Sequence, residues 1–358
     1  MSLRKGLIIF ILLAFGMNAF IILRSVDKDT IRSLVSASKI KLLLALCTVF
    51  IAWLCDAGRF CALAKAAHEH VSLPFGIALT WLNYFGSAVT PMQSGGGPFQ
   101  VYALYKKGIP VGKGIAITLI RTMLTILILT LAVPIALLLD PEILAGSPFL
   151  KGIVSYVFIV ILATWAFVAL TILKPEMIRG LCRMVVMWLR RFNIMKSNRM
   201  VIKIFQWLDK EIDNYILNFR IAFHSGKTWL AAGAVLSVLH LVSLFTVLPV
   251  LMSAVGLPFR YAQTIAVQAV FMFILYFVPT PGASGVAEGG GALLYSVLMP
   301  DNMAGIMAII CRFFTDYISI FMGVVIVIRM LGWGVSENLH KGASPESEAL
   351  RTESERNA

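Results

Sequence analysis

The segment TPMQSGGGPFQVYALYKKGIP (residues 90–110) returns 190 residues later as TPGASGVAEGGGALLYSVLMP (residues 280–300). The two copies agree at Thr90/Thr280, Pro91/Pro281, Ser94/Ser284, Gly95/Gly285, Leu104/Leu294, Tyr105/Tyr295 and Pro110/Pro300. Such matching indicates an internal duplication. Each copy interrupts a long uncharged run with Pro and Gly. Backbone that leaves a helix at membrane depth is tolerated only where protein buries it or where it lines a wet cavity, so a duplicated break points to a transport site.

The composition indicates an all-α, polytopic integral membrane protein. Hydrophobic residues make up 59% and charged residues 14% of the 358 residues, far from the averages of soluble domains. Residues 71–105 and 152–173 contain no Asp, Glu, Lys or Arg, and runs of this length exceed what a soluble helix buries. The five cysteines and five histidines follow no disulfide or metal-ligand spacing, so we predict no metal and no cofactor.

Eight membrane spans are predicted, each long enough to cross the hydrocarbon core. They cover residues 7–23, 41–65, 71–90, 114–139, 150–173, 229–255, 260–278 and 303–331. Segments 91–110 and 281–300 are too short and too broken to cross alone, so we interpret them as re-entrant.

The duplicated unit is two helices, a re-entrant segment and a third helix. Repeat A then covers residues 39–139 and repeat B residues 229–331, within one transmembrane domain over residues 1–333. The remaining residues, 334–358, are small, polar and charged, which predicts a disordered tail.

The span count favours repeats of equal orientation. Four predicted spans separate equivalent positions of the two copies. If both Gly/Pro segments return to the side from which they enter, an even number of crossings brings the chain back to the same side, and the two repeats are parallel. An inverted arrangement, which is common in transporters, would require one segment to cross. Both arrangements stay open from the sequence.

The only sizeable polar region, residues 174–228, is rich in Lys and Arg. Apolar residues recur in it at helical spacing, which is typical of surface-lying helices that attract anionic phospholipid headgroups. Because the charge is embedded in membrane-active helices, we predict no nucleic-acid binding. Placing loops 24–41, 106–113 and 174–227 together on one side collects most basic residues there, which predicts that this side is cytoplasmic.

Six ionisable side chains fall within the membrane segments. They are Asp56, Arg59, Arg121, Glu288, Arg312 and Asp316. Each is costly in hydrocarbon, so each should face a partner or a polar cavity. Asp56 and Arg59 are three residues apart, and Arg312 and Asp316 are four apart, which puts each pair on one helix face. Each pair is either an ion bridge that helps helices pack or part of a functional site.

Glu288 is the only charged residue between Tyr261 and Pro300. If Val286 begins a half-helix, Glu288 lies in its first turn, where the helix dipole favours the carboxylate. That position suits a group that meets a cationic headgroup or a coupling proton. The alternative is an N-terminal cap that holds the break in shape.

Glycines in the first copy predict a phosphate site. Successive amides at Gly95, Gly96 and Gly97, before Pro98, can form an anion-binding concavity. The guanidinium groups of the three intramembrane arginines supply matching charge. The predicted substrate-binding residues are Asp56, Arg59, Gly95, Gly96, Gly97, Pro98, Gln100, Arg121, Pro281, Gly282, Ser284, Gly285, Glu288, Arg312 and Asp316.

Three motifs resemble those of the flippase-like membrane-domain family related to lysyl-phosphatidylglycerol synthases. They are GGGPFQVYALYKKGI from Gly95, PTPGASGVAEG from Pro279 and RFFTD from Arg312, and the similarity extends from about residue 7 to 333. The resemblance implies a lipid-translocating membrane domain, which some members join to a cytosolic aminoacyl transferase. We recognise no transferase domain here and expect no lysyl transfer. Some relatives carry Glu where this chain has Gln100.

Two functions follow as expectations. The first is a flippase or transporter of a phosphate-bearing lipid, such as an aminoacylated lipid, a polyprenyl phosphate or a glycolipid, in the inner cytoplasmic membrane, working with membrane lipids and a separate lipid-modifying enzyme. The second is a membrane enzyme or accessory subunit of lipid or glycan transfer. An enzyme would need an activated nucleophile, and Ser94, Ser284 and Glu288 have no histidine near them in sequence.

Overall fold

A computed structural model of the protein describes residues 3–25, 28–139 and 226–341, with a few isolated positions between 159 and 187. All elements in these ranges are helices, which confirms the predicted class of all-α membrane protein. Four of them are long and apolar enough to cross a membrane: Lys39–Ala66, Val111–Leu138, Lys227–Ala254 and Asp301–Met330. Apart from the isolated positions, the predicted span 150–173 and the basic loop up to residue 225 lie outside the described residues.

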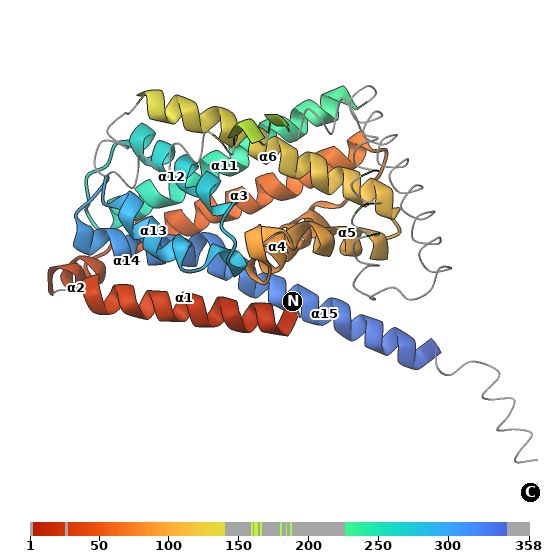
Figure 1. Ribbon diagram of the computed structural model, residues 1–358, viewed down its shortest axis with the longest axis horizontal. Coiled ribbons are helices and arrows are strands. Elements are labelled where there is room, and N and C mark those ends of the chain that lie inside the picture. Colours follow the sequence, from red (N-terminus) through yellow and green to blue (C-terminus); the bar gives the residue numbers. More distant parts are fainter. Residues whose placement is uncertain are drawn as a thin grey trace, which may run out of the picture.

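The same order of helices occurs twice along the chain (Figure 1). Two helices come first, α1 (Leu3–Ser25) and α2 (Lys28–Val35). The first set is α3 (Lys39–Ala66), α4 (Leu73–Ala88), η1 (Pro91–Gln93), α5 (Gly96–Lys106) and α6 (Val111–Leu139). The second set is α11 (Lys227–Ala254), α12 (Tyr261–Leu275), η2 (Pro281–Ala283), α13 (Val286–Tyr295), and then α14 (Asp301–Arg312), the π-helix η3 (Phe313–Tyr317) and α15 (Ile318–Lys341) in one continuous rod. Because α15 runs to Lys341, helix continues past the boundary predicted at residue 334.

The two breaks share a left-handed turn at two consecutive residues. Met92 and Gln93 have φ of 53° and 51°, and their equivalents 190 residues later, Gly282 and Ala283, have φ of 59° and 52°. Left-handed backbone costs residues other than glycine about 1–3 kcal/mol, and it persists only where the surroundings enforce it. Since the side chains differ between the copies, the tertiary structure and not the residue type imposes this turn.

Each break joins two antiparallel helices into a hairpin. In the first hairpin, Gln100 of α5 donates from Nε2 to the carbonyl of Leu79 on α4 at 3.0 Å. Gly86 lies so close to α5 that an added Cβ would sit 2.6 Å from the carbonyl oxygen of Gly95. In the second hairpin, the Tyr295 hydroxyl of α13 donates to Gln268 Oε1 of α12 at 2.9 Å.

Two of the predicted spans contain shorter helices in the structure. Helices α4 and α12 have 16 and 15 residues, about 24 Å and 22 Å at 1.5 Å per residue, which is less than a 30 Å hydrocarbon core. Each lies within one of the predicted spans 71–90 and 260–278 and forms the first arm of a hairpin whose second arm is the Gly/Pro segment.

Equivalent helices of the two repeats run antiparallel. Near the start of α3, Lys41 Nζ donates to the carbonyl of Ser253 at the end of α11 at 2.8 Å. At the other end, Lys65 Nζ lies 4.3 Å from the ring centroid of Trp229. The repeats are thus inverted, and the favoured parallel arrangement is wrong. The span count favoured parallel repeats because it treated α4 and α12 as independent spans, whereas each forms a hairpin with the segment that follows it.

The inverted arrangement places the hairpins at opposite ends of the bundle. We name end A the end where Ser38 donates its amide to the carbonyl of Ala254, and end B the end that holds Lys65 and Trp229. In Figure 1 the α4–α5 hairpin occupies one half of the molecule and the α12–α13 hairpin the other. Ser38 of the predicted loop 24–41 lies at end A, whereas Lys113 pairs with Glu69 at end B. The prediction that loops 24–41 and 106–113 share one side is therefore wrong.

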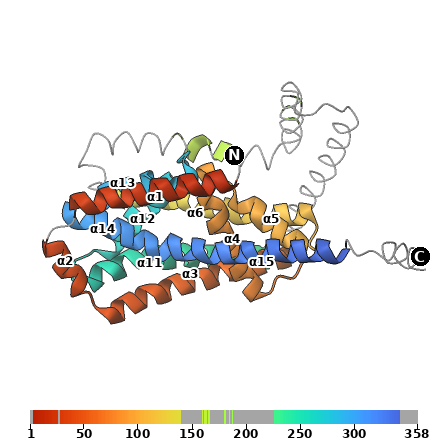
Figure 2. The same cartoon turned by 90° about the horizontal axis from the view of Figure 1, so that it is seen from below.

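Small side chains let α3 and α11 pack closely. An added Cβ on Gly233 would lie 3.0 Å from Leu63, and one on Gly58 would lie 3.4 Å from Leu236. Close approach of this kind drives helix association in lipid, where apolar burial alone gives little. The second half of α3 packs on the first hairpin, where Leu63 shares a core cluster with Leu79 of α4. In the first half of α3, Val49 belongs to the core cluster that contains Leu294 of the second hairpin. Helix α1 lies along the outside of the bundle (Figure 2).

A matched pair of substitutions tests the first hairpin. Gly86→Ala should destabilise the protein by about 1–3 kcal/mol, because the new methyl group would overlap α5 backbone. Gly97→Ala should be neutral or stabilising by up to about 1 kcal/mol, because nothing lies within 4 Å of its added Cβ and alanine favours helix. Thermal unfolding in detergent measures both. Equal effects would show that α4 and α5 do not pack as described.

Single cysteines at two equivalent positions test the inversion. Lys106 at the end of α5 and Ser296 after α13 are both exposed and 190 residues apart. In a cysteine-free background, Lys106→Cys and Ser296→Cys should react with an impermeant maleimide from opposite faces of a sealed membrane. Reaction of both from the same face would restore the parallel arrangement.

Candidate functional site between the two hairpins

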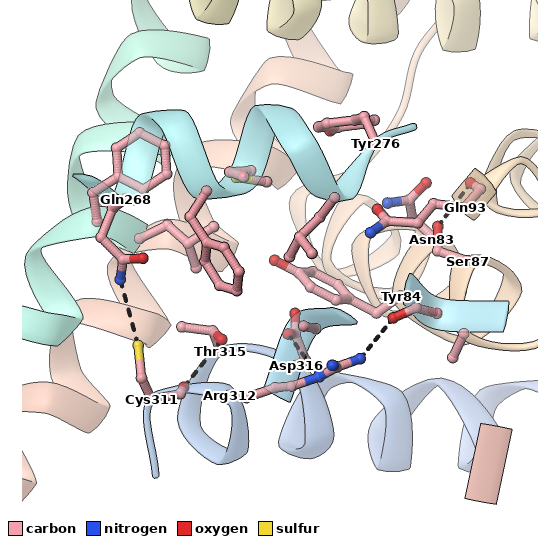
Figure 3. A pocket seen from close by; sticks show the side chains of 18 of the residues that line it. Asn83, Tyr84, Ser87, Gln93, Gln268, Tyr276, Cys311, Arg312, Thr315 and Asp316 are labelled. Carbon is pink, nitrogen blue, oxygen red and sulfur yellow. Dashed lines mark hydrogen bonds and ion pairs between the residues drawn. The ribbon is translucent and has the colours of Figure 1, made fainter. Parts of the chain in front are cut away.

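The tips of the two hairpins meet, as the duplicated breaks predict. The amide of Met92 in η1 donates to the carbonyl of Val278 beside η2 at 3.2 Å. A cavity of about 120 Å³ opens next to this contact, and Gln93 and Gly282 from the two breaks both line it (Figure 3). Its volume admits several water molecules or a polar headgroup, but not acyl chains.

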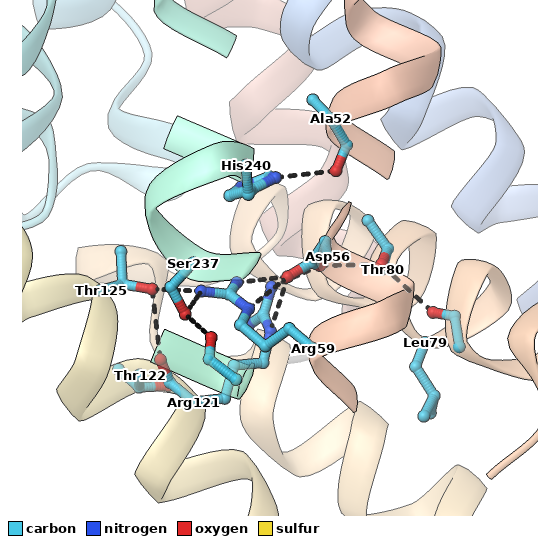
Figure 4. A network of polar contacts seen from close by, with 12 residues as sticks. Ala52, Asp56, Arg59, Leu79, Thr80, Arg121, Thr122, Thr125, Ser237 and His240 are labelled. Atoms are coloured by element: carbon cyan, nitrogen blue, oxygen red, sulfur yellow. Dashed lines mark hydrogen bonds and ion pairs between the residues drawn. The ribbon is translucent and has the colours of Figure 1, made fainter. Parts of the chain in front are cut away.

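A buried cluster of charged side chains forms one wall of the cavity (Figure 4). We call it the Asp56 cluster; its members are Asp56, Arg59 and Arg121, each at most 7% exposed. Arg121 binds the carboxylate with two hydrogen bonds, from Nε to Oδ1 at 3.1 Å and from Nη2 to Oδ2 at 2.7 Å. Arg59 approaches Oδ1 with Nε at 2.8 Å and with Nη2. The predicted pairing of Asp56 with Arg59 is confirmed.

Hydroxyl groups complete the Asp56 cluster. Thr80 donates to Asp56 Oδ2 at 2.7 Å, while Arg59 Nη1 donates to Thr125 at 2.7 Å and Ser237 at 3.3 Å. Arg59 thereby uses all its nitrogens. Arg121 does not, since Nη1 makes no hydrogen bond within the described part of the chain. Two guanidiniums around one carboxylate leave one excess positive charge, and Arg121 presents it at the cavity.

A second buried cluster surrounds Arg312 at the tip of the second hairpin. We call it the Arg312 cluster; it comprises Arg312, Glu288, Asp316 and Tyr317. Arg312 Nη2 donates to the carbonyl of Gly282 at 2.6 Å. Nη1 lies 2.9 Å from Glu288 Oε1 and Nε lies 3.6 Å from Asp316 Oδ2, but neither nitrogen makes a hydrogen bond. The predicted pairing of Arg312 with Asp316 is confirmed, although it is long.

Glu288 sits at the start of a half-helix, as predicted. Helix α13 begins at Val286, and Glu288 Oε2 accepts the amide hydrogen of Gly285 at 2.7 Å. Glu288 Oε1 accepts the hydroxyl of Tyr317 at 3.0 Å, and Asn18 of α1 donates to the same hydroxyl at 3.1 Å. The carboxylate is fully buried. It therefore caps the half-helix, as one of the two interpretations predicts, and it also pairs with Arg312.

The rod that carries Arg312 contains a π-helix. Residues Phe313–Tyr317 form this wider turn between α14 and α15, so that Thr315 and Asp316 both line the cavity. Single π-turns inside α-helices occur frequently at functional sites. The sequence did not predict the π-helix, because one inserted residue hardly changes the 3.6-residue spacing of apolar side chains along the rod.

The structure distributes the predicted site residues in three ways. Those that line the cavity are Arg59, Arg121, Gly282, Arg312 and Asp316. Behind the cavity wall, Asp56 contacts Arg121 and Glu288 contacts Arg312. Gly285 donates its amide to Glu288, and Pro281 and Ser284 are buried at the second break. Gly95, Gly96, Gly97, Pro98 and Gln100 do not line the cavity. The Gly95 amide donates to Thr90 Oγ1 at 2.7 Å, and Gly95 and Gly96 serve close packing of the first hairpin.

Several cavity residues were missed. Tyr84, Gln268, Tyr276 and His240 all line the cavity. Each is a polar residue inside an apolar run, which is a signal that the ionisable groups overshadowed. His240 Nδ1 lies 2.9 Å from the carbonyl of Ala52, so it also ties α11 to α3.

Comparison with known proteins identifies the family of the chain. The sequence profile of a family described as "Lysylphosphatidylglycerol synthase TM region" matches residues 5–323. The chain belongs to this family. It is also 25% identical over 283 residues to a "UPF0104 membrane protein" of Archaeoglobus fulgidus, which covers 77% of this chain and 82% of the relative. For this member of the lysylphosphatidylglycerol synthase TM family, the resemblance inferred from the motifs is confirmed.

Removal of one carboxylate tests the Asp56 cluster of this family member. Asp56→Asn should destabilise the protein by about 3–5 kcal/mol, since Arg59 and Arg121 would keep buried charges without a counterion. Glu69→Gln is the matched control. It breaks the 2.6 Å pair with Lys113, which is about a quarter exposed, and should cost at most about 1 kcal/mol. Denaturant titration in detergent compares them, and an equal cost would contradict the buried network.

Proposed function

We propose that this protein transports a lipid with a phosphate-bearing headgroup across the cell membrane, with the headgroup passing through the cavity between the hairpins. The observation that carries the proposal is the pair of cavity-lining arginines, Arg121 and Arg312. Arg121 Nη1 makes no hydrogen bond within the described residues and lies on a side chain that lines the cavity. Arg312 Nε and Nη1 are buried and make no hydrogen bond there, although Nη1 is ion-paired with Glu288 Oε1 at 2.9 Å. Buried guanidinium donors without acceptors are costly, and phosphate oxygens match them in charge and geometry.

One arginine comes from each inverted repeat. Arg121 lies on α6, the third long helix of the first set, and Arg312 lies on the rod that occupies the same place in the second. A phosphate held between the repeats would exchange contacts when one repeat tilts against the other. Inverted repeats around a central site support alternating access of this kind.

The hairpins would serve as re-entrant elements. Each has both ends at one end of the bundle, and its tip reaches the other tip near the middle. We infer that each enters the bilayer from one face and returns to it. The cavity would then be reached by a headgroup from either face, while the acyl chains stay outside in lipid.

The basic residues favour an orientation with end B in the cytoplasm, in the inner membrane of the cell. Lys65, Lys106, Lys107 and Lys113 lie there, and the basic loop 174–228 reaches the described residues at Gly226 on this end. Cytoplasmic loops carry an excess of Lys and Arg. Anionic headgroups would gather at this surface, where a separate lipid-modifying enzyme could deliver its product.

Lipid movement in reconstituted vesicles tests the proposal. Purified protein should expose acyl-chain-labelled phospholipid to an impermeant quencher much faster than protein-free vesicles do. Arg121→Gln and Arg312→Gln should each reduce this rate at least tenfold, because each removes donors for the phosphate. Lys113→Gln, a change outside the cavity at end B, should leave the rate unchanged. A wild-type rate equal to that of empty vesicles would refute transport.

A further inference from the structure

The two carboxylates of the Arg312 cluster differ in access to the cavity. The side chain of Asp316 is 34% exposed, whereas that of Glu288 is fully buried. Asp316 lines the cavity and Glu288 does not. Only Asp316 can therefore touch a molecule in the cavity directly.

The two carboxylates also differ in how far their charge is already satisfied. Glu288 accepts hydrogen bonds from the Gly285 amide and the Tyr317 hydroxyl and pairs with Arg312 Nη1 at 2.9 Å. Asp316 makes no hydrogen bond within the described residues, and its nearest cation is Arg312 Nε at 3.6 Å. Glu288 thus balances the charge of Arg312, and Asp316 carries one excess negative charge next to the cavity.

Aromatic side chains share the cavity with Asp316. Tyr84, Tyr276 and Phe271 line it, and Figure 3 shows Tyr84, Tyr276 and Asp316 around the same space. A carboxylate beside aromatic faces is a favourable environment for an ammonium group. Arg121 of the Asp56 cluster, which has one excess positive charge, lines the same cavity. One excess charge of each sign matches a ligand that is zwitterionic and neutral overall.

We propose that Asp316 binds the ammonium group of a zwitterionic headgroup whose phosphate is held by Arg312 and Arg121. The proposal rests on the phosphate site of the proposed function and names the substrate class for it. Because Arg312 Nε and Asp316 Oδ2 are only 3.6 Å apart, the opposite charges of the ligand must be near neighbours. A phosphoethanolamine headgroup meets this requirement. Phosphoglycerol does not, because it has no cation.

A transport comparison of two lipids tests the assignment. Wild-type protein in vesicles should move acyl-chain-labelled phosphatidylethanolamine at least tenfold faster than phosphatidylglycerol with the same label. Asp316→Asn should reduce the rate for phosphatidylethanolamine at least tenfold and should not reduce that for phosphatidylglycerol. Asp301→Asn, which removes an exposed carboxylate at the start of α14, is the matched control and should change neither rate. Equal loss for both lipids in Asp316→Asn would overturn the proposal.

A binding measurement separates this inference from the question of transport. In detergent, glycerophosphoethanolamine should raise the unfolding temperature of the wild-type protein, and glycerophosphoglycerol should raise it less. The difference should vanish in Asp316→Asn and persist in Asp316→Glu, which keeps the charge. If the protein moved no lipid yet showed this pattern, transport would fail and the ammonium site would stand. Equal stabilisation of wild type by both compounds would overturn the ammonium site, whatever the vesicles show.

Discussion

Backbone groups that leave a helix inside a membrane protein need partners within the protein, and this constraint organises the structure. At the first break, Ser87 donates to the carbonyl of Gln93 at 3.1 Å, and Thr90 both donates to Gly86 and accepts the Gly95 amide. At the second break, Thr280 donates to the carbonyl of Ser284 at 2.9 Å. The breaks also satisfy each other through Met92 and Val278. The hairpin tips meet because lipid hydrocarbon offers no hydrogen-bond donor or acceptor that could replace this pairing.

The positions of the buried charges at the second break follow from the same constraint. Arg312 donates to the carbonyl of Gly282, a left-handed residue of the second break, and so brings a guanidinium to the tip. A buried guanidinium requires a carboxylate, which Glu288 supplies from the half-helix that starts just after the break. Glu288 is in turn held by the Gly285 amide. The fold of the break and the electrostatics of the cavity are therefore one network, in which a change at Glu288 alters both.

The two clusters have different characters. The Asp56 cluster is saturated except for one nitrogen of Arg121, and it joins α3, α4, α6 and α11. It therefore combines a packing role with one contact to the cavity. The Arg312 cluster is less complete, since Arg312 Nε and Nη1 and Ser284 Oγ lack hydrogen bonds. Incomplete satisfaction of buried polar atoms marks the place where a ligand can add contacts.

Periodicity and composition were sufficient to predict the helical class, the duplication and the helix beginning at Val286, because these depend on local pattern. Chemistry also pointed to Arg59, Arg121, Arg312 and Asp316, which all line the cavity, since a charge inside an apolar run must find a partner wherever the chain takes it. Orientation of the repeats was missed because hydropathy alone counts α4 and α12 as crossings. The hairpins that α4 forms with α5 and α12 forms with α13 depend on close packing at Gly86 and on the contact between Gln268 and Tyr295.

The sequence by itself therefore determined which residues are expensive to bury and where the helices break. Only the tertiary structure decided that the repeats are inverted and that the glycines from Gly95 pack helices instead of lining the cavity. It also decided that Asp316, and not Glu288, faces the cavity. The physical reason is that hydrogen bonding within a helix and hydropathy are properties of neighbouring residues, whereas saturation of a carboxylate depends on partners that are distant in sequence. The residues around Glu288 come from four separate elements or junctions: Asn18, Gly285, Arg312 and Tyr317.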